Sequence, residues 1–332
     1  MKLATFCDPH GKLRVGAVHS HNLKILDLAE AARRTHVEGE SFSDMLTLME
    51  AGPRALDAAR KLLESAADDP SLNHNVSSIQ LKSPVPVPNS IRDFVAFRGH
   101  ILGAPVALRA LAAEMDGKPA EPASAPGAVP QVFLRQPNYY KGNRFSVVGT
   151  DAPVQRPIAS NYLDYELEFG IFIGTKGQNI PKRDAHRHIF GYSIFNDFSA
   201  RDTQVREAGG MTGPCKSKDF NTGNAIGPWI VTADEMPDPY RLKMVSRVNG
   251  ETWCSATSSG MLHSFEDMID YVSRDEWLYP GEFFGSGTVA GGTGMEINRY
   301  LKDGDVIELE VEGIGILRNR IVGASGSTGV SK

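Results

Sequence analysis

The sequence predicts an α+β fold dominated by strands: a mixed β-sheet rolled on itself, with a small α/β unit at the N-terminus. Three observations support this prediction. Apolar and polar residues alternate repeatedly in the C-terminal half, strand and helix patterns share the N-terminal part, and a proline-rich segment separates the two. We expect a small unit over residues 1–81, a larger unit over 82–322 and a disordered tail over 323–332, which is small-residue-rich and polar.

The N-terminal unit shows two strand patterns followed by two helical ones. We expect strands over residues 12–18 and 24–28 and helices from about Ser41 and Pro53. Proline suits the first turn of a helix because its missing N–H would be unbonded there. The packed face of the second helix is predicted by helical spacing at Leu56, Ala59 and Leu63.

Two segments rich in proline interrupt the predicted strands and helices. Residues 82–89 carry prolines in alternation, which favours extended backbone and predicts a linker, with the unit boundary near Leu81. Residues 116–130, rich in Pro, Ala and Gly, follow a helix expected over residues 106–114. Such a long segment inside a compact unit is more often a mobile lid or binding loop than a core element, and a passive excursion fits the same composition.

The C-terminal unit contains two strand patterns and one clear helix. One strand is indicated by alternation at Leu167, Phe169, Ile171 and Ile173, and a half-solvated strand by Ile307, Leu309 and Val311. Ser264 can cap a helix whose apolar face is Phe265, Met268, Ile269 and Val272.

Composition narrows the class of protein. Hydrophobic residues make up 41% and charged residues 23%, which is ordinary globular usage. No apolar run approaches the roughly 20 residues that span a bilayer, and the N-terminus lacks a signal-peptide apolar region, so we expect no membrane association and a cytoplasmic location. A net charge of −5 offers no basic face for nucleic acid, which favours a small-molecule ligand.

The cysteine pattern indicates neither a cysteine metal site nor a disulfide framework. Cys7, Cys215 and Cys254 are odd in number and far apart, so we expect them to stay reduced. Cys215 lies beside Lys216 and Lys218, which could lower its pKa, but no His-rich motif accompanies it and an ordinary thiol is the simpler interpretation.

Acidic residues provide the most specific chemical signal. On a strand, Glu166 and Glu168 point to the same face, which is either a solvated surface or half of a cation site. Asp197 follows the apolar run 189–195 and can add an oxygen ligand from another element, as Mg²⁺, Mn²⁺ or Ca²⁺ requires. His186 and His188 have ligand spacing, but they lie in a charged stretch that is typical of a surface.

Four motifs in order resemble the fumarylacetoacetate hydrolase family across roughly residues 84–322. They are YLDYELEFGIFIG, GYSIFNDFSARDTQ, KSKDFNTGNAIGPWIVT, and GTVAGGTG followed by LKDGDVIELEVEGIG. The resemblance implies the family's mixed β-sheet roll, a divalent metal such as Mg²⁺, Mn²⁺ or Ca²⁺, an oxo-acid substrate and a homodimer.

The resemblance also implies roles for single residues. Asp93 joins Glu166, Glu168 and Asp197 as a metal ligand, and His100, seven residues after Asp93, is the general base. Substrate contacts are implied for Arg109, Tyr140, Arg201, Gln204, Lys218 and Thr222. The chain departs from the family pattern at Asn221, where an Asp is frequent, and in the stretch 291–298, where Glu296 is the candidate for the acid that orients the histidine.

These roles predict a metal-dependent hydrolase that cleaves a carbon–carbon bond of a 1,3-diketo acid, an acylpyruvate or fumarylacetoacetate, as in aromatic catabolism. His100 would activate the attacking water while the metal polarises the carbonyl. Two alternatives stay open. The same metal site could serve an oxo-acid decarboxylase, isomerase or hydratase, or it could be a structural cation site in a non-catalytic binding protein.

Overall fold

The computed structural model describes residues 1–37, 39–119, 127–210 and 212–323. Strands dominate it, as predicted. Part of the expected lid, residues 120–126, and all but the first residue of the expected disordered tail over 323–332 lie outside the described residues, so these two predictions stay untested.

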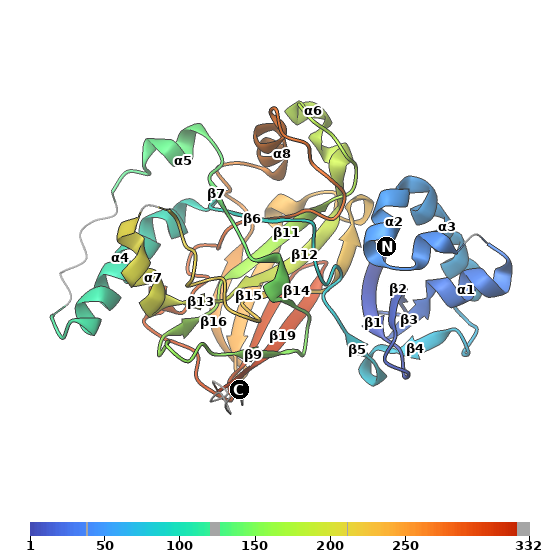
Figure 1. Cartoon of the computed structure of the whole chain (residues 1–332), viewed down its shortest axis with the longest axis horizontal. Coiled ribbons are helices and arrows are strands. Elements are labelled where there is room, and N and C mark those ends of the chain that lie inside the picture. Colours follow the sequence, from blue (N-terminus) through green and yellow to red (C-terminus); the bar gives the residue numbers. More distant parts are fainter. Residues whose placement is uncertain (38, 120–126, 211, 324–332) are drawn as a thin grey trace, which may run out of the picture.

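The described strands are β1 Lys2–Cys7, β2 Leu13–His19, β3 Lys24–Asp27, β4 Asn73–Asn75, β5 Gln80–Leu81, β6 Ile91–Phe94, β7 Tyr139–Lys141, β8 Val147–Val148, β9 Pro153–Gln155, β10 Leu163–Asp164, β11 Leu167–Ile173, β12 Ile189–Asp197, β13 Ser199–Ala200, β14 Asn224–Thr232, β15 Lys243–Val248, β16 Glu251–Thr257, β17 Phe283–Gly285, β18 Val306–Val311 and β19 Gly315–Val322. The α-helices are α1 Leu28–Thr35, α2 Met45–Ala51, α3 Pro53–Ala66, α4 Arg98–Met115, α5 Gln131–Arg135, α6 Lys182–Ala185, α7 Arg201–Glu207 and α8 Phe265–Ser273. Helices α1 to α3 lie at one end of the molecule, α4, α5 and α7 at the other, and α6 and α8 along the upper edge between them (Figure 1).

One large mixed sheet runs through both parts of the molecule. Its order is β4-β3-β2-β1-β14-β12-β11-β17-β6-β7, with β5 beside β1 and β8 beside β14. The N-terminal strand β1 pairs antiparallel with β14, where Leu3 faces Ile230. The N-terminal unit is therefore joined to the rest by backbone hydrogen bonds, and the boundary near Leu81 stays a prediction about sequence organisation.

The predicted N-terminal strands and helices are present, with two differences. Strand β1 and helix α1 were not expected, and α2 begins at Met45, later than Ser41. The predicted face of α3 is correct only at Ala59. The buried residues are Ala55, Ala59, Leu62 and Ala66, while Leu56 and Leu63 are only partly buried at the edge of the same core. The helix is rotated relative to that prediction, and its buried face, rich in small residues, packs against α1 and α2.

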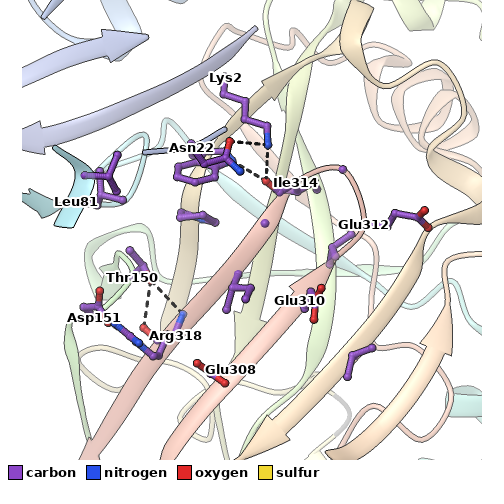
Figure 2. Close-up of a pocket in the computed structure, with 18 of the residues that line it drawn as sticks. Lys2, Asn22, Leu81, Thr150, Asp151, Glu308, Glu310, Glu312, Ile314 and Arg318 are labelled. Atoms are coloured by element: carbon purple, nitrogen blue, oxygen red, sulfur yellow. Dashed lines mark hydrogen bonds and ion pairs between the residues drawn. The ribbon is translucent and has the colours of Figure 1, made fainter. Parts of the chain in front are cut away.

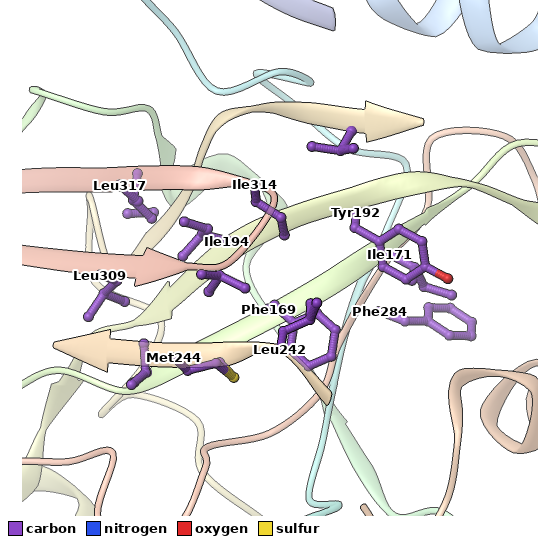
Figure 3. Packing of buried hydrophobic residues seen from close by; sticks show 14 of the residues in the cluster. Phe169, Ile171, Tyr192, Ile194, Leu242, Met244, Phe284, Leu309, Ile314 and Leu317 are labelled. Carbon is purple, nitrogen blue, oxygen red and sulfur yellow. The ribbon is translucent and has the colours of Figure 1, made fainter. Parts of the chain in front are cut away.

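The main core lies between the large sheet and a second, five-stranded sheet of order β16-β15-β18-β19-β9. Figure 3 shows Phe169 and Ile194 from the large sheet packing towards Met244, Leu309 and Leu317 from the second. The predicted alternation in β18 is confirmed, because its apolar residues are buried and the intervening glutamates are only partly so. Two sheets packed in this way form the predicted strand-rich α+β architecture.

Two helices in the C-terminal part were predicted. Ser264 caps α8 in a reciprocal capping box with Asp267, and the predicted face of Phe265, Met268, Ile269 and Val272 is buried. Helix α4 is longer than expected and places His100 in its first turn. Within the part of the chain that the structure covers, no helix combines the length and apolarity needed to cross a bilayer.

Candidate active site

The candidate site is built at one end of three central strands. Asp93 lies on β6, Glu168 on β11 and Asp197 at the end of β12, while Glu166 directly precedes β11. Strand β17 separates β6 from β11 and contributes Gly285, which pairs with Asp93. A Cβ atom at Gly285 would lie 2.3 Å from Oδ1 of Asp93. The missing side chain therefore makes room for the Asp93 carboxylate.

These four carboxylates converge, each offering an oxygen atom within 4.8 Å of the others. All four are buried. Burial and the Asp197 charge raise the pKa of Asp93 well above its ordinary value, and burial and the Asp93 charge do the same for the pKa of Glu168. Burial likewise raises the pKa of Asp197 to about 6, although Lys218 opposes the shift. Such shifts express the repulsion between like charges held out of water.

Two buried cations offset part of this charge. Nζ of Lys218 lies 2.7 Å from Oε2 of Glu166 and 2.5 Å from Oδ2 of Asp197. The guanidinium of Arg201 donates to Glu166 Oε1 at 2.8 Å and to Gln204 Oε1 at 2.7 Å. Burial alone would raise the pKa of Glu166, but Lys218 and Arg201 outweigh burial and hold it below its ordinary value.

Neutral hydroxyl groups complete the surroundings of the carboxylates. Tyr140 donates its hydroxyl hydrogen to Asp197 Oδ2 at 2.6 Å, and Thr288 donates to Glu168 Oε1 at 3.0 Å. Among the described residues, Oδ1 of Asp93, Oε2 of Glu168 and Oδ1 of Asp197 are buried without a hydrogen-bond partner. Buried, unpaired carboxylate oxygens are costly, and a hard divalent cation is the ligand that such a set fits.

Asp164 is a part of the site that the sequence interpretation missed. Its carboxylate pairs with Nε of Arg201 at 2.8 Å and accepts hydrogen bonds from the backbone N–H groups of Gly294 at 2.7 Å and Met295 at 3.1 Å. Asp164 thereby connects a residue that holds Glu166 to the loop before Glu296. Its spacing of two from Glu166 along the chain was the available signal.

A histidine and a carboxylate lie beside the cluster. Nδ1 of His100 is 3.2 Å from Oε1 of Glu296, and both side chains are largely buried. A charge on His100 would help to lower the pKa of Glu166, after Lys218 and Arg201, so the imidazole lies within electrostatic range of that carboxylate. The structure thus puts the candidate acid Glu296 against His100, although the two are 196 residues apart in sequence.

Other predicted substrate residues are placed differently. Arg201 and Gln204 form a pair within the site wall, but Arg109 is exposed nine residues after His100, about 13 Å along the helix at 1.5 Å per residue. The Thr222 hydroxyl accepts a hydrogen bond from the backbone N–H of Gln155 at 2.9 Å. The structure therefore brings Tyr140 and Lys218 to the carboxylates and does not bring Arg109 or Thr222 there.

The remaining sequence candidates lie on or near the surface. Asn221, Cys215 and His186 are exposed, and His188 is partly buried, with Nδ1 2.8 Å from the carbonyl oxygen of Thr175. Cys7, Cys215 and Cys254 are all free thiols, as predicted. The expected surface position of the histidine pair is therefore correct.

A large cavity lies away from the carboxylates. A cavity of about 740 Å³ opens between the N-terminal unit and the second sheet, where Lys2 and Asn22 face Glu308 and Glu310 of β18 (Figure 2). None of the described residues lining it belongs to the carboxylate cluster. The acidic and basic side chains that line this cavity are similar in number, and several of them form ion pairs with one another. We place the candidate active site at the carboxylate cluster and not at this cavity, because buried carboxylate oxygens without a hydrogen-bond partner favour the binding of a cation.

Comparisons with known proteins identify the family and the fold. Residues 101–322 match the model of the fumarylacetoacetate (FAA) hydrolase C-terminal family. Oxaloacetate tautomerase YisK of Bacillus subtilis is 30% identical over 328 residues, which is 97% of this chain and all of that protein. Human mitochondrial oxaloacetate tautomerase FAHD2A is 35% identical over 189 residues, covering 57% of this chain and 60% of its own length.

Solved structures show the same fold. A fumarylacetoacetate hydrolase from Exiguobacterium antarcticum matches with a TM-score of 0.72 and 27% identity over 98% of this chain and all of that one. Maleylpyruvate hydrolase from Sphingobium sp. SYK-6, solved with manganese(II) and pyruvate, matches with a TM-score of 0.70 and 23% identity over 98% of this chain and all of that one. At 23% identity, the similarity to maleylpyruvate hydrolase shows a shared fold only.

Proposed function

The chain belongs to the fumarylacetoacetate hydrolase family, and we propose that it is a divalent-metal-dependent enzyme that tautomerises oxaloacetate or a closely related 2-oxo dicarboxylic acid. One observation carries the proposal: the His100–Glu296 pair lies beside four carboxylates with unpaired buried oxygens. Similarity to an oxaloacetate tautomerase across nearly the whole chain supports this substrate class. Carbon–carbon bond hydrolysis, the function expected from the sequence, is therefore the second candidate.

The carboxylates suit a metal that binds an oxo-acid. Asp93, Glu166, Glu168 and Asp197 would hold Mg²⁺ or Mn²⁺, which would polarise the carbonyl and acidify the neighbouring carbon. Oxygen-only ligands favour such hard cations over zinc. Tyr140 fixes the orientation of Asp197, and Thr288 does the same for Glu168.

The histidine suits the proton transfers of a tautomerisation. Because Nδ1 of His100 faces Glu296, the Nε2 atom is available to exchange a proton with substrate. His100 would take a proton from the carbon next to the carbonyl and return one to the carbonyl oxygen. Glu296 would stabilise the imidazolium that exists between the two steps.

Hydrolysis of a carbon–carbon bond is the second candidate. A carboxylate-oriented histidine can deprotonate water as well as carbon, and an acylpyruvate offers the same two oxygens to a metal as oxaloacetate does. The observation that favours this candidate is the same pair, His100 and Glu296. The two candidates differ in whether water enters the product.

Substrate turnover separates the candidates. Chelator-treated protein reloaded with Mn²⁺ or Mg²⁺ would be given enol oxaloacetate, acylpyruvates and maleylpyruvate, with enol absorbance and product masses followed. We expect rapid ketonisation of oxaloacetate, abolished by chelator. Release of pyruvate from an acylpyruvate, without acceleration of ketonisation, would reject the tautomerase in favour of the hydrolase.

Three further expectations accompany the proposal. We propose a homodimer, a cytoplasmic location, and substrate contacts from Tyr140, Arg201 and Lys218. Roles for Arg109, Gln204 and Thr222 stay predictions and require that substrate or metal changes their surroundings. Light scattering of the purified chain at several concentrations tests the homodimer directly.

A further inference from the structure

Lys218 holds the position of a cation between two of the four carboxylates. Its side chain is only 3% exposed, and Nζ lies 2.7 Å from Glu166 Oε2, 2.5 Å from Asp197 Oδ2 and 3.5 Å from the Asp197 carbonyl oxygen. It also lies 5.9 Å from the centre of the Tyr140 ring. The family resemblance implied only a substrate contact for Lys218, so its burial against two carboxylates was not expected.

Hydrogen bonds to its backbone hold the loop that carries Lys218. Glu207, at the end of α7, accepts hydrogen bonds from the backbone N–H groups of Cys215, Lys216 and Ser217. The backbone N–H of Lys218 closes a turn onto the carbonyl of Cys215 at 3.0 Å. The four-carbon stem of a lysine nevertheless allows its ammonium to swing by several ångströms.

The ammonium neutralises only one side of the cluster. Glu166 and Asp197 contact it, whereas Asp93 and Glu168 keep unpaired buried oxygens. A divalent cation that uses all four residues must share Glu166 and Asp197 with the ammonium or displace it. Because like charges repel strongly at such distances in a buried site, the two cations compete.

We propose that the ammonium of Lys218 is the resident counter-ion of the metal-free site and competes with the divalent ion for Glu166 and Asp197. Lys218 thus keeps the cluster folded without metal and lowers its metal affinity below that of the carboxylates alone. This inference rests on the metal site of the proposed function, and it adds a residue that sets the affinity of that site.

Calorimetric titration of the full chain with Mn²⁺ after chelator treatment tests the inference. We would compare wild type with Lys218→Met, Lys218→Gln and, as a matched control, Lys216→Met, which removes an exposed lysine from the same loop. We expect both Lys218 variants to bind Mn²⁺ at least about tenfold more tightly, and the Lys216 variant to bind as wild type does. In chelator, both Lys218 variants should melt at a lower temperature than wild type, and Mn²⁺ should remove that difference.

The outcomes separate this inference from the proposed function. Wild-type binding with unchanged or weaker affinity in the folded Lys218→Gln variant would overturn the competition alone. Near-ultraviolet circular dichroism identifies folded variants, and the glutamine variant keeps hydrogen-bond donors where methionine has none. If no chain, wild type included, bound Mn²⁺ or Mg²⁺, the metal-dependent function would be overturned together with the inference.

Discussion

Nδ1 of His100 lies 3.2 Å from Oε1 of Glu296, across the contact between α4 and the short 3-10 helix Met295–Ile297. The contact is close because residue 103 has no side chain: a Cβ atom there would lie 2.8 Å from the same Oε1. Glu296 Oε2 is buried without a partner within the described chain. Its Oε1 therefore has the position that the proposed orientation of the imidazole requires.

The first prediction concerns that acid. Glu296→Gln keeps an oxygen acceptor for His100 but removes the charge that stabilises imidazolium. We expect kcat to fall by a factor between about 10 and 10⁴, the upper limit being the whole contribution of a general base. Mn²⁺ affinity should stay unchanged. The control is Glu251→Gln, which removes an exposed carboxylate paired with Arg299 and should leave kcat at its wild-type value. Equal kcat in wild type and Glu296→Gln would contradict this role.

The second prediction uses two neighbouring ligands that carry opposite electrostatic roles. Glu168 repels Asp93, so Glu168→Gln should leave the melting temperature in chelator equal to or above that of wild type. The charge of Glu166 balances those of Lys218 and Arg201, so Glu166→Gln should lower the melting temperature in chelator. Thermal melts with and without Mn²⁺ check both. Mn²⁺ should raise the melting temperature of wild type but of neither variant. If Mn²⁺ raised the melting temperature of Glu168→Gln as much as that of wild type, Glu168 would not be a metal ligand.

Strand alternation and the acidic motifs made much of this structure predictable. Strand β18 buries one face only, so its period of two is visible in the sequence. Strand β1 is buried on both faces over most of its length and therefore shows no alternation. Helix α1 has only eight residues, too few for a helical period to stand out.

The candidate site was predictable only where its residues share a motif. Glu168 lies on β11 and Glu166 directly precedes that strand, so local spacing brings the two together. Asp164 meets Gly294 across 130 residues, and this contact depends on tertiary structure. The burial of Lys218 depends in the same way on the partners of its loop, which its polar neighbours do not reveal. Local sequence thus identified candidate ligands, and tertiary folding determined their charge balance.

The third prediction compares a buried and an exposed ion pair of the same chemistry. Asp164→Asn removes one of the two buried carboxylates that pair with the fully buried Arg201 and leaves only Glu166, so we expect a loss of up to about 3–5 kcal/mol in the free energy of unfolding. Asp151→Asn breaks an exposed pair with Arg318 and should cost about 0–1 kcal/mol. Urea unfolding followed by fluorescence measures both, and similar losses would show that Asp164 does not brace the site.

The fourth prediction concerns thiol reactivity. Burial, with a contribution from the Glu296 charge, raises the pKa of Cys254 to about 11, so at pH 8 about one thiol in a thousand is ionised there. Cys215 is exposed. Alkylation with iodoacetamide at pH 8, followed by peptide mass spectrometry, should label Cys215 much faster than Cys254. Unfolding in urea should abolish the difference, and rapid labelling of Cys254 in the folded chain would contradict its burial.

The last prediction tests His100 as the group that moves protons. The four carboxylates do not include His100, so His100→Ala should keep Mn²⁺ affinity within about twofold while losing about 10²–10⁴-fold in the rate of oxaloacetate ketonisation. In D₂O the wild-type enzyme should place deuterium on the carbon next to the carbonyl faster than free Mn²⁺ does, because the base delivers solvent-derived hydrogen there. The alanine variant should fall to the rate of the metal alone. If the variant still exchanges deuterium at the wild-type rate, another residue is the base and the pairing with Glu296 has a structural role. If wild type exchanges no faster than free Mn²⁺ yet releases pyruvate from acylpyruvates, the histidine acts on water and the chain is a hydrolase.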